Sequence, residues 1–292
     1  MEQSQHMAPI GVGMIQQWLR SLEPEPLLET VKAEGADFIE MYLTHKEWER
    51  RLSWLRLAKS LSLGYTFHGP YHGEYELSRF EDREDNGVRK AFLALLEQAA
   101  AETWDNGITS RINIHGASSS EFTRGHLFGI TLSFLTWLAR ERERRRWPFD
   151  FVVELLPHDT DKEKTGDCVE DLVALRRELG DTIAGFCWDM GHYRRNELLG
   201  FDSSLESSFI EKVRHVHVHD IKDIKEDFDH CPLDFGTVPY ESYLGMLRGN
   251  PLRIVLELNY SHTLTCGDPV KGLTGSLGKI RAARDSLGLM EI

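Results

Sequence analysis

The chain contains two short stretches of the same kind, Gly185-Phe-Cys-Trp-Asp-Met-Gly-His192 and Val213-Arg-His-Val-His-Val-His-Asp220. Each begins as a mainly apolar run that predicts a buried strand, and each ends in a cluster of histidine and aspartate. Polar and charged groups at the end of a buried strand cost free energy unless a partner satisfies them. The two stretches therefore predict two strands whose tips carry a functional site.

The composition is that of an ordinary globular protein. Hydrophobic residues make up 41% and charged residues 28% of the 292 residues, which leaves ample apolar material for a core. The formal net charge of -13 counts against a surface built for nucleic-acid phosphates, since that affinity comes mainly from Lys and Arg. The four cysteines are scattered without a CxxC pair, so we expect neither a zinc knuckle nor a disulfide framework.

The sequence carries no recognisable targeting pattern. Residues 1–6 are polar, and residues 9–18 hold too few apolar side chains for a signal peptide. No apolar run approaches the length of a membrane span. Together with the scattered cysteines, these features predict a cytoplasmic protein without a membrane or nucleic-acid partner.

Strand-like and helix-like segments alternate along the whole chain. Eight apolar runs predict strands at Ile10–Met14, Phe38–Tyr42, Leu63–Phe67, Arg111–Ile114, Phe151–Leu155, Ala184–Trp188, Val213–Val218 and Ile254–Leu258. Helices are predicted at Leu27–Glu34, His45–Ser60, Val88–Thr103, Phe122–Arg146, Val169–Leu179, Ser204–Lys212, Pro239–Leu247 and Val270–Leu287. We expect Asn86 and Asp167 to cap two of these helices and Gly180 to end one.

This alternation predicts a (β/α)8 TIM barrel of class α/β, a fold of about 250 residues, as a single domain over residues 1–292. The second reading is a doubly wound open sheet, which carries a glycine-rich turn after its first strand. Gly11-Val-Gly13 lacks the third glycine of such a turn, and a glycine pair in a strand commonly marks close packing. The barrel is therefore the predicted fold.

Six successive predicted strands end in histidine, glutamate or aspartate. The residues at these ends are His68, His115, Glu154, Asp189 with His192, His217, and Glu257. In a barrel, the carboxyl ends of the strands converge on one face, where the active site lies. A single polar residue at a strand end is most often an ordinary hydrogen-bonding group, but six on consecutive strands predict a shared site.

Three of these side chains are carboxylates with no Lys or Arg beside them on the strand ends. Glu154, Asp189 and Glu257 would repel one another inside a barrel mouth unless a positive charge compensates them. A divalent cation held by carboxylates and imidazole supplies that charge, and such a ligand set suits Mn²⁺, Co²⁺, Mg²⁺ or Zn²⁺. The sequence therefore predicts a divalent metal ion as cofactor.

With these residues, the chain resembles the xylose isomerase-like TIM barrels, a superfamily of sugar and sugar-phosphate isomerases and epimerases that includes endonuclease IV. The resemblance runs from the His68 strand to the Glu257 strand in the expected order. Its pieces are His68-Gly-Pro-Tyr71, His115-Gly116, Glu154, Asp189-x-x-His192, His217-Val-His-Asp220, His230-Cys-Pro-Leu233 and Glu257. Each piece alone is unspecific, and the ordered set carries the resemblance.

The ketose 3-epimerase branch of this group implies one metal ion, with Glu154, Asp189, His217 and Glu257 as its ligands. By the same resemblance, the two glutamates act as acid and base on opposite faces of the substrate, through an enediolate. His192 matches a histidine that contacts substrate oxygens. The resemblance thus implies a metal-dependent isomerase or epimerase of a sugar or sugar phosphate.

The endonuclease IV branch implies an alternative, a multi-zinc phosphoesterase. Its ligands correspond to His68, His115, Glu154, Asp189, His192, His217, His230 and Glu257, with an aspartate two residues before His230. That position is Phe228 here, flanked by Asp227 and Asp229, which puts a third metal in doubt. The acidic balance also counts against DNA. Hence His68, His115, His192 and His230 are candidates either for substrate binding or for a second metal.

A third function, dehydration of an inosose-type polyol, uses the same one-metal site. His219 and Lys222 are candidate substrate contacts. His219 is equally suited to a hydrogen bond in its loop. Lys222 could neutralise a phosphate or carboxylate of the substrate, although a surface position is the favoured reading. The role of His215 stays open, and no role is assigned to His72, His158 or His262. The expected partner is a small sugar or polyol, and the sequence leaves the oligomeric state open, a homo-oligomer included.

Overall fold

The computed structural model describes residues 6–103, 110–201, 204–224 and 228–291. Within them, eight parallel strands form a closed barrel in the order β10-β11-β2-β3-β4-β5-β7-β9. These strands are β2 (Ile10–Met14), β3 (Phe38–Tyr42), β4 (Gly64–His68), β5 (Ser110–Ile114), β7 (Phe149–Glu154), β9 (Gly185–Asp189), β10 (Val213–Val218) and β11 (Arg253–Leu256). The predicted single-domain (β/α)8 barrel is confirmed.

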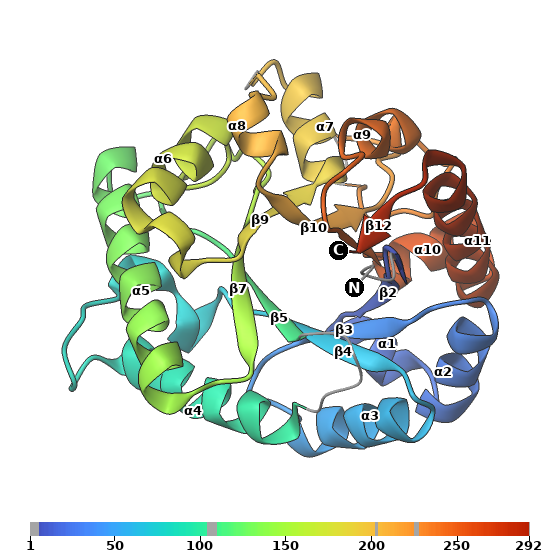
Figure 1. Ribbon diagram of the computed structural model, residues 1–292, viewed down its shortest axis with the longest axis horizontal. Coiled ribbons are helices and arrows are strands. Elements are labelled where there is room, and N and C mark those ends of the chain that lie inside the picture. The colour runs from blue at the N-terminus through green and yellow to red at the C-terminus, as the bar shows by residue number, and fades with distance from the viewer. Residues whose placement is uncertain (1–5, 104–109, 202–203, 225–227, 292) are drawn as a thin grey trace, which may run out of the picture.

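Helices surround the barrel as a ring (Figure 1). They are α1 (Gln16–Ser21), α2 (Pro24–Ala33), α3 (Trp48–Ser60), α4 (Gly87–Glu102), α5 (Arg124–Arg145), α6 (Val169–Leu179), α7 (Met190–Leu198), α8 (Ser207–Ile210), α9 (Tyr240–Met246), α10 (Tyr260–Cys266) and α11 (Pro269–Leu287). Short 3-10 turns add η1 (Gly73–Tyr75), η2 (Leu77–Arg79) and η3 (Gly180–Thr182). Among the described helices, none is both long enough and apolar enough to span a bilayer.

The ends of two helices test the predicted caps. The Asn86 side chain accepts a hydrogen bond from the Arg89 backbone N–H at 3.0 Å, so this cap of α4 is confirmed. The predicted Asp167 cap of α6 is wrong, because the residue before the helix is Cys168. The Asp167 carboxylate pairs instead with Arg124 and with His158. The Asp167 carboxylate therefore forms ion pairs and does not cap the helix.

The glycine pair in β2 serves packing. A Cβ atom on Gly11 would lie 2.3 Å from the ring of Phe38, which sits on the adjacent strand β3. A Cβ on Gly13 would lie 3.3 Å from Cγ of Glu257. Because Gly11 and Gly13 have no side chains, β2 leaves room for the core residue Phe38 and, nearer its carboxyl end, for the predicted site residue Glu257.

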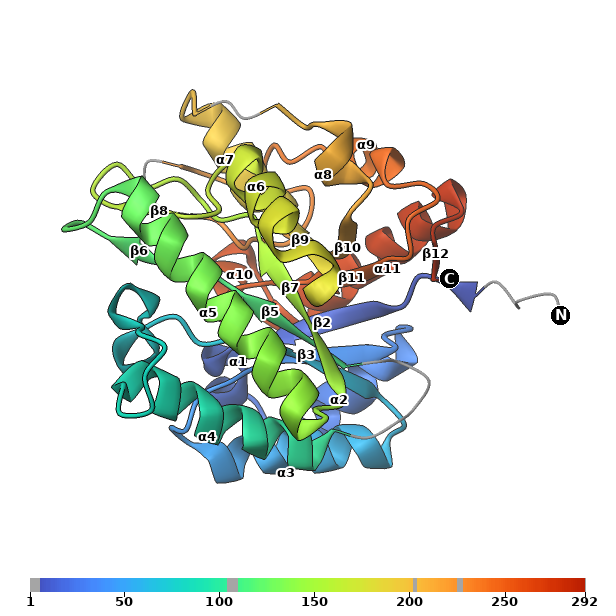
Figure 2. The same ribbon diagram turned by 60° about the vertical axis from the view of Figure 1, so that its left-hand side comes forward.

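Two further pairs of short strands lie outside the barrel. β1 (His6–Met7) and β12 (Met290–Glu291) join the two ends of the described chain. β6 (Ser118–Ser119) and β8 (Glu163–Lys164) pair in antiparallel fashion (Figure 2) and connect the loop after β5 with the loop after β7. The second pair belongs to the rim on the side where the strands end, which is where the site lies.

Candidate active site

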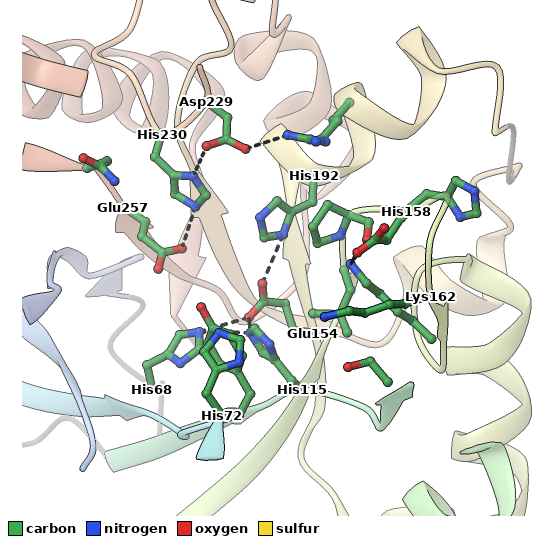
Figure 3. A pocket seen from close by; sticks show the side chains of 18 of the residues that line it. His68, His72, His115, Glu154, His158, Lys162, His192, Asp229, His230 and Glu257 are labelled. Atoms are coloured by element: carbon green, nitrogen blue, oxygen red, sulfur yellow. Dashed lines mark hydrogen bonds and ion pairs between the residues drawn. The ribbon is translucent and has the colours of Figure 1, made fainter. Parts of the chain in front are cut away.

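A cavity of about 970 Å³ opens at the carboxyl ends of the barrel strands (Figure 3). Its lining includes six of the residues predicted for the site: His68, His115, Glu154, His192, His230 and Glu257. Asp189 and His217 are fully buried and do not reach the lining. The structure therefore brings the predicted side chains together at the face of the barrel where such folds bind their substrates.

Four consecutive strands bring the predicted metal ligands together. Glu154 and Asp189 end β7 and β9, His217 lies opposite Asp189 on β10, and Glu257 follows β11. The Nδ1 atom of His217 lies 2.9 Å from Glu257 Oε2, 3.7 Å from Asp189 Oδ2 and 3.9 Å from Glu154 Oε2. Ligands that share one ion at bonds of about 2.0–2.2 Å stand at separations of this size.

Unsatisfied polar atoms at the same place fit a cation. Glu154 Oε1, Asp189 Oδ2 and His217 Nδ1 are buried and form no hydrogen bond of regular geometry among the described residues. Their neighbours are other atoms of the cluster, His192 Nδ1 at 3.2 and 3.3 Å from the two oxygens and Glu257 Oε2 at 2.9 Å from the nitrogen. Glu154, Asp189 and His217 each offer a ligand atom within 4.8 Å of the other two. A buried acceptor left unpaired costs about 1–3 kcal/mol, and a shared cation would satisfy these atoms together. The donor set therefore fits a divalent metal ion.

Glu40 supports the histidine of this set from below. It is a buried residue in the middle of β3, and its two carboxylate oxygens lie 2.9 Å from His217 Nε2 and 2.9 Å from His215 Nε2. A hydrogen bond from His217 Nε2 to the carboxylate leaves the Nδ1 lone pair directed at the ligand cluster, as in carboxylate–histidine–metal arrangements. Sequence reasoning missed Glu40, although a lone carboxylate in the run Phe38-Ile-Glu-Met-Tyr42 is a signal.

Two histidines flank Glu154 on its other side. His115 Nε2 lies 3.0 Å from Glu154 Oε2 and 3.2 Å from His68 Nε2, which itself lies 3.3 Å from that same oxygen. Burial lowers the pKa of His68, but the hydrogen bond and attraction from Glu154 prevail and raise it to about 9. Burial lowers the pKa of His115. With Glu154, these histidines form a second group that could hold a metal.

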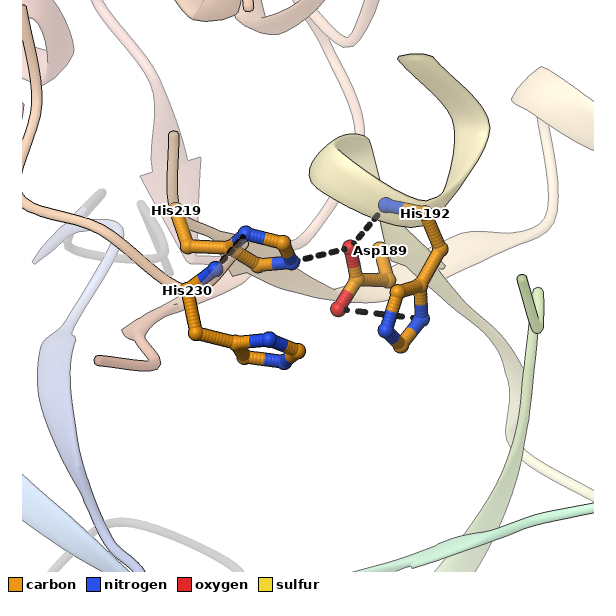
Figure 4. A group of neighbouring side chains, drawn as sticks. All are labelled: Asp189, His192, His219 and His230. Carbon is orange, nitrogen blue, oxygen red and sulfur yellow. Dashed lines mark hydrogen bonds and ion pairs between the residues drawn. The ribbon is translucent and has the colours of Figure 1, made fainter. Parts of the chain in front are cut away.

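A third group surrounds Asp189 (Figure 4). The backbone N–H of His192 donates to Asp189 Oδ1 at 2.7 Å, and His219 Nε2 lies 3.1 Å from the same oxygen. The backbone N–H of His230 donates to His219 Nδ1 at 3.0 Å, so the hydrogen of His219 is on Nε2 and is donated to Asp189. His219 is fully buried and thus orients Asp189 instead of lining the cavity.

The loop before His230 differs from the endonuclease IV pattern in a defined way. Phe228 stacks on His262 with ring centroids 4.6 Å apart. Its neighbour Asp229 lines the cavity, and its carboxylate lies 2.8 Å from His230 Nδ1 and 3.1 Å from Arg195 Nη1. Burial lowers the pKa of His230, but Asp229 raises it to about 10. Asp227 lies outside the described residues.

The carboxylates and imidazoles of the site hold one another in their charged forms. Burial raises the pKa of Glu257, but attraction by His217 and other histidines outweighs it and lowers that pKa to about 2. Neighbouring histidines likewise hold the pKa values of Glu154 and Asp189 well below their usual range. Burial lowers the pKa of His217, whereas nearby Cys187 and Glu257 raise it well above its ordinary value. The floor of the cavity is thus built for bound positive charge.

The remaining predicted residues lie elsewhere. Lys222 is exposed, its Nζ atom lies 5.1 Å from the centre of the Phe228 ring, and it is not part of the cavity lining. His215 is buried beneath His217, where burial lowers its pKa to about 4. Residues without a predicted role also line the cavity, namely His72, His158, Lys162, Lys164, Arg195 and His262.

Comparison with known proteins agrees with this architecture. A family model for the xylose isomerase-like TIM barrel matches residues 28–284. A D-tagatose 3-epimerase-like protein superimposes with a TM-score of 0.67 at 16% identity, over 96% of this chain and 98% of its own. A 3-keto-D-glucoside 4-epimerase from E. coli superimposes with a TM-score of 0.64 at 15% identity, over 94% of this chain and 99% of its own. A probable 3-DHS dehydratase from Bacillus anthracis superimposes with a TM-score of 0.60 at 14% identity, over 94% of this chain and 98% of its own.

These likenesses in structure concern the fold, because the identities are low. A search of curated proteins finds no match. The choice of reaction and substrate therefore depends on the site of this chain, since one fold hosts many chemistries.

Proposed function

This chain belongs to the xylose isomerase-like TIM barrel family, and on that premise we propose that it is a divalent-metal-dependent isomerase or epimerase of a sugar or sugar phosphate. The observation that carries the proposal is the convergence of Glu154, Asp189, His217 and Glu257 from four consecutive strands, with buried oxygen and nitrogen atoms among them that form no hydrogen bond of regular geometry. These four residues would hold the ion.

The two glutamates are suited to move protons. When bound, a divalent cation supplies a Lewis acid for the carbonyl and hydroxyl oxygens of the substrate. Glu257 lines the cavity with its carboxylate ionised, the form that accepts a proton from the carbon next to a carbonyl. Glu154 also lines the cavity and is the partner that returns a proton to the resulting enediolate. Because its own carboxylate is ionised, that proton would come from His68, whose imidazole lies 3.3 Å away and has a raised pKa. The chemistry interconverts two sugars and consumes no co-substrate.

The second candidate is a phosphoesterase with more than one metal ion. The groups His68–His115–Glu154 and Asp189–His192–His219–His230 favour it, because each could hold an ion of its own. Phe228, which packs on His262 instead of offering an oxygen, and the net charge of -13 count against it. A dehydratase acting on a cyclic polyol would use the same glutamates and release water.

Exchange of carbon-bound hydrogen with solvent tests the proposal. Several structures of similar fold are named as ketose 3-epimerases, and two of these hold D-allulose or D-tagatose. The protein loaded with Mn²⁺, Co²⁺, Mg²⁺ or Zn²⁺ would therefore be incubated in D2O with D-allulose, D-tagatose, D-fructose and their phosphates. We expect deuterium at the carbon next to the carbonyl of at least one sugar, detected by NMR.

Glu154→Gln and Glu257→Gln should each slow this exchange by about 10²–10⁴-fold, the usual contribution of a positioned acid or base. Glu170→Gln, an exposed residue in the first turn of α6, is the matched control and should leave the rate unchanged. Equal rates in wild type and in both site variants would exclude the glutamates as the acid–base pair. Release of water from a polyol would assign a dehydratase, and release of phosphate an esterase.

A further inference from the structure

We propose that the substrate carries an anionic substituent, a carboxylate or a phosphate, and that Lys162 in the outer wall of the cavity binds it. This inference rests on the proposed function and names the class of sugar that the site takes. Lys162 is separate from the predicted metal ligands, because it lies in the loop after β7, beyond the ends of the barrel strands.

The cavity extends well beyond the ligand cluster. Its volume of about 970 Å³ is near the upper end of the range of about 300–1,000 Å³ for small-molecule pockets. One side is the floor formed by the carboxylates and histidines, and the other is a wall contributed by residues 157–164 of the loop after β7, with His72 and Ser118 beside it. A sugar bound at the floor would direct its far end toward this wall.

Lys162 is the cation of the wall that remains available. Its side chain is exposed and lines the cavity, and Figure 3 shows it reaching inward toward the floor. Among the residues that the structure describes, no carboxylate or hydrogen-bond acceptor is paired with its ammonium group. It is close enough to His72 to help lower the pKa of that imidazole, after burial. An anion at this point would meet an uncompensated positive charge.

The other cations of the wall already have partners. Lys164 Nζ donates to the backbone oxygen of Pro157 at 2.8 Å and lies 3.8 Å from Asp159. Arg195 Nη1 lies 3.1 Å from Asp229. Both side chains thus have a carboxylate neighbour, whereas none is paired with Lys162 among the residues that the structure describes. The cavity also contains the hydroxyl groups of Ser118 and Thr160, which can donate to a carboxylate or phosphate.

The loop that carries Lys162 is fixed at both ends. The backbone N–H of His158 donates to Asn196 Oδ1 at 2.6 Å, and Asn196 Nδ2 donates to the backbone oxygens of Leu156 and Asp167, each at 3.0 Å. Ser118 and Lys164 lie opposite each other in the β6–β8 pair. Because these bonds hold the loop before any ligand arrives, little ordering free energy is lost when an anion binds.

Binding of matched neutral and anionic sugars tests the subsite. Calorimetric titrations would compare D-fructose with D-fructose 6-phosphate and D-glucose with D-glucuronate, on the purified protein without added metal so that free ions do not bridge ligands. We expect at least one anion to bind about tenfold more tightly than its neutral counterpart, the gain from one charge-assisted hydrogen bond. A larger gain for the phosphate or for the uronate identifies the substituent.

Lys162→Gln should reduce this preference to within about twofold, whereas Lys222→Gln, an exposed lysine outside the cavity, should leave it intact. The inference is overturned if neither anion binds more tightly than its neutral counterpart, and an anion whose binding cannot be detected counts as not preferred. It is also overturned if Lys162→Gln weakens the binding of the neutral and the anionic sugar of a pair equally. The titration measures binding and needs no turnover. If the anion preference is found but no hydrogen exchange, the proposed reaction is rejected and the anion subsite stands. If hydrogen exchange is found but no anion preference, the subsite is rejected and the reaction stands.

Discussion

The two glutamates of the site end strands of the same barrel but have different surroundings. Glu154 is 1% exposed, and His68, His115 and His192 lie within 3.3 Å of its carboxylate. Glu257 is 8% exposed, and among the described histidines His217 is the one within that distance, with His230 at 3.9 Å. Glu154 is enclosed by protein, whereas Glu257 faces the room that Gly13 leaves in β2.

The difference separates two tasks that one residue type performs. An enclosed carboxylate with several imidazole partners holds its position, which suits a ligand that fixes the metal and the opposite face of the substrate. A carboxylate with fewer partners moves more easily between an ion and a carbon-bound proton. We therefore infer that, of the two acid–base groups, Glu154 is held in place by its neighbours and Glu257 is the more mobile one.

Removing the charge of each glutamate in turn should produce the largest contrast. Glu154→Gln removes the carboxylate charge beside His68, His115 and His192, and we expect it to lower the free energy of unfolding of the metal-free protein by about 3–5 kcal/mol. Glu257→Gln should cost clearly less, because water in the cavity can solvate the group. Urea denaturation measures both. Equal losses of unfolding free energy in the two variants would contradict the distinction between a fixed Glu154 and a more mobile Glu257.

A change at Glu40 tests whether the floor is supported from below. Glu40→Gln disturbs the hydrogen bond that directs His217 Nδ1 toward the ligand cluster, and we expect about 10–100-fold weaker binding of Mn²⁺ or Zn²⁺ by calorimetry. Glu141→Gln is the matched control, since Glu141 is a buried glutamate paired with Arg144 and Arg145 outside the cavity. If both variants bind metal like the wild type, Glu40 serves the fold alone.

The pH dependence of metal binding gives a smaller effect with a defined sign. In the metal-free protein the pKa of His217 is raised, so its imidazole holds a proton that an ion has to displace. Glu154, Asp189 and Glu257 have lowered pKa values and stay ionised. Affinity should therefore fall about tenfold for each unit of pH decrease between 8 and 6, per proton displaced.

Titration in two buffers of different ionisation enthalpy counts those protons. We expect about one proton released per ion at pH 7, and more if a second histidine is displaced. An affinity that is flat with pH and a binding reaction without proton release would show that His217 is not a ligand.

The sequence was sufficient for the barrel and for the residues at the strand ends. Strands β2, β3 and β10 have the predicted bounds, and the other barrel strands differ by one or two residues at one or both ends. The alternation of apolar runs with helices and the common direction of parallel strands are enough to predict which tips meet. The family model and the closed barrel confirm the predicted fold.

The sequence was not sufficient for residues whose role depends on what lies across the barrel. Glu40 lies inside an apolar strand, and its partners His215 and His217 are far along the chain. The tautomer of His219 depends on a backbone N–H of His230, at a residue with a φ of 49°. Lys162 lines the cavity from a loop that the β6–β8 pair joins to the loop after β5, and no local sequence pattern indicates that placement.

Diffraction from crystals soaked with Mn²⁺, collected at an energy where manganese scatters anomalously, tests the central claim most directly. We predict one anomalous peak per chain, at about 2.0–2.3 Å from carboxylate oxygens of Glu154, Asp189 and Glu257 and from Nδ1 of His217. Peaks at His68–His115 or at His192–His230 instead would contradict a single-metal site and favour the phosphoesterase. The absence of any peak among these residues would contradict the metal site itself.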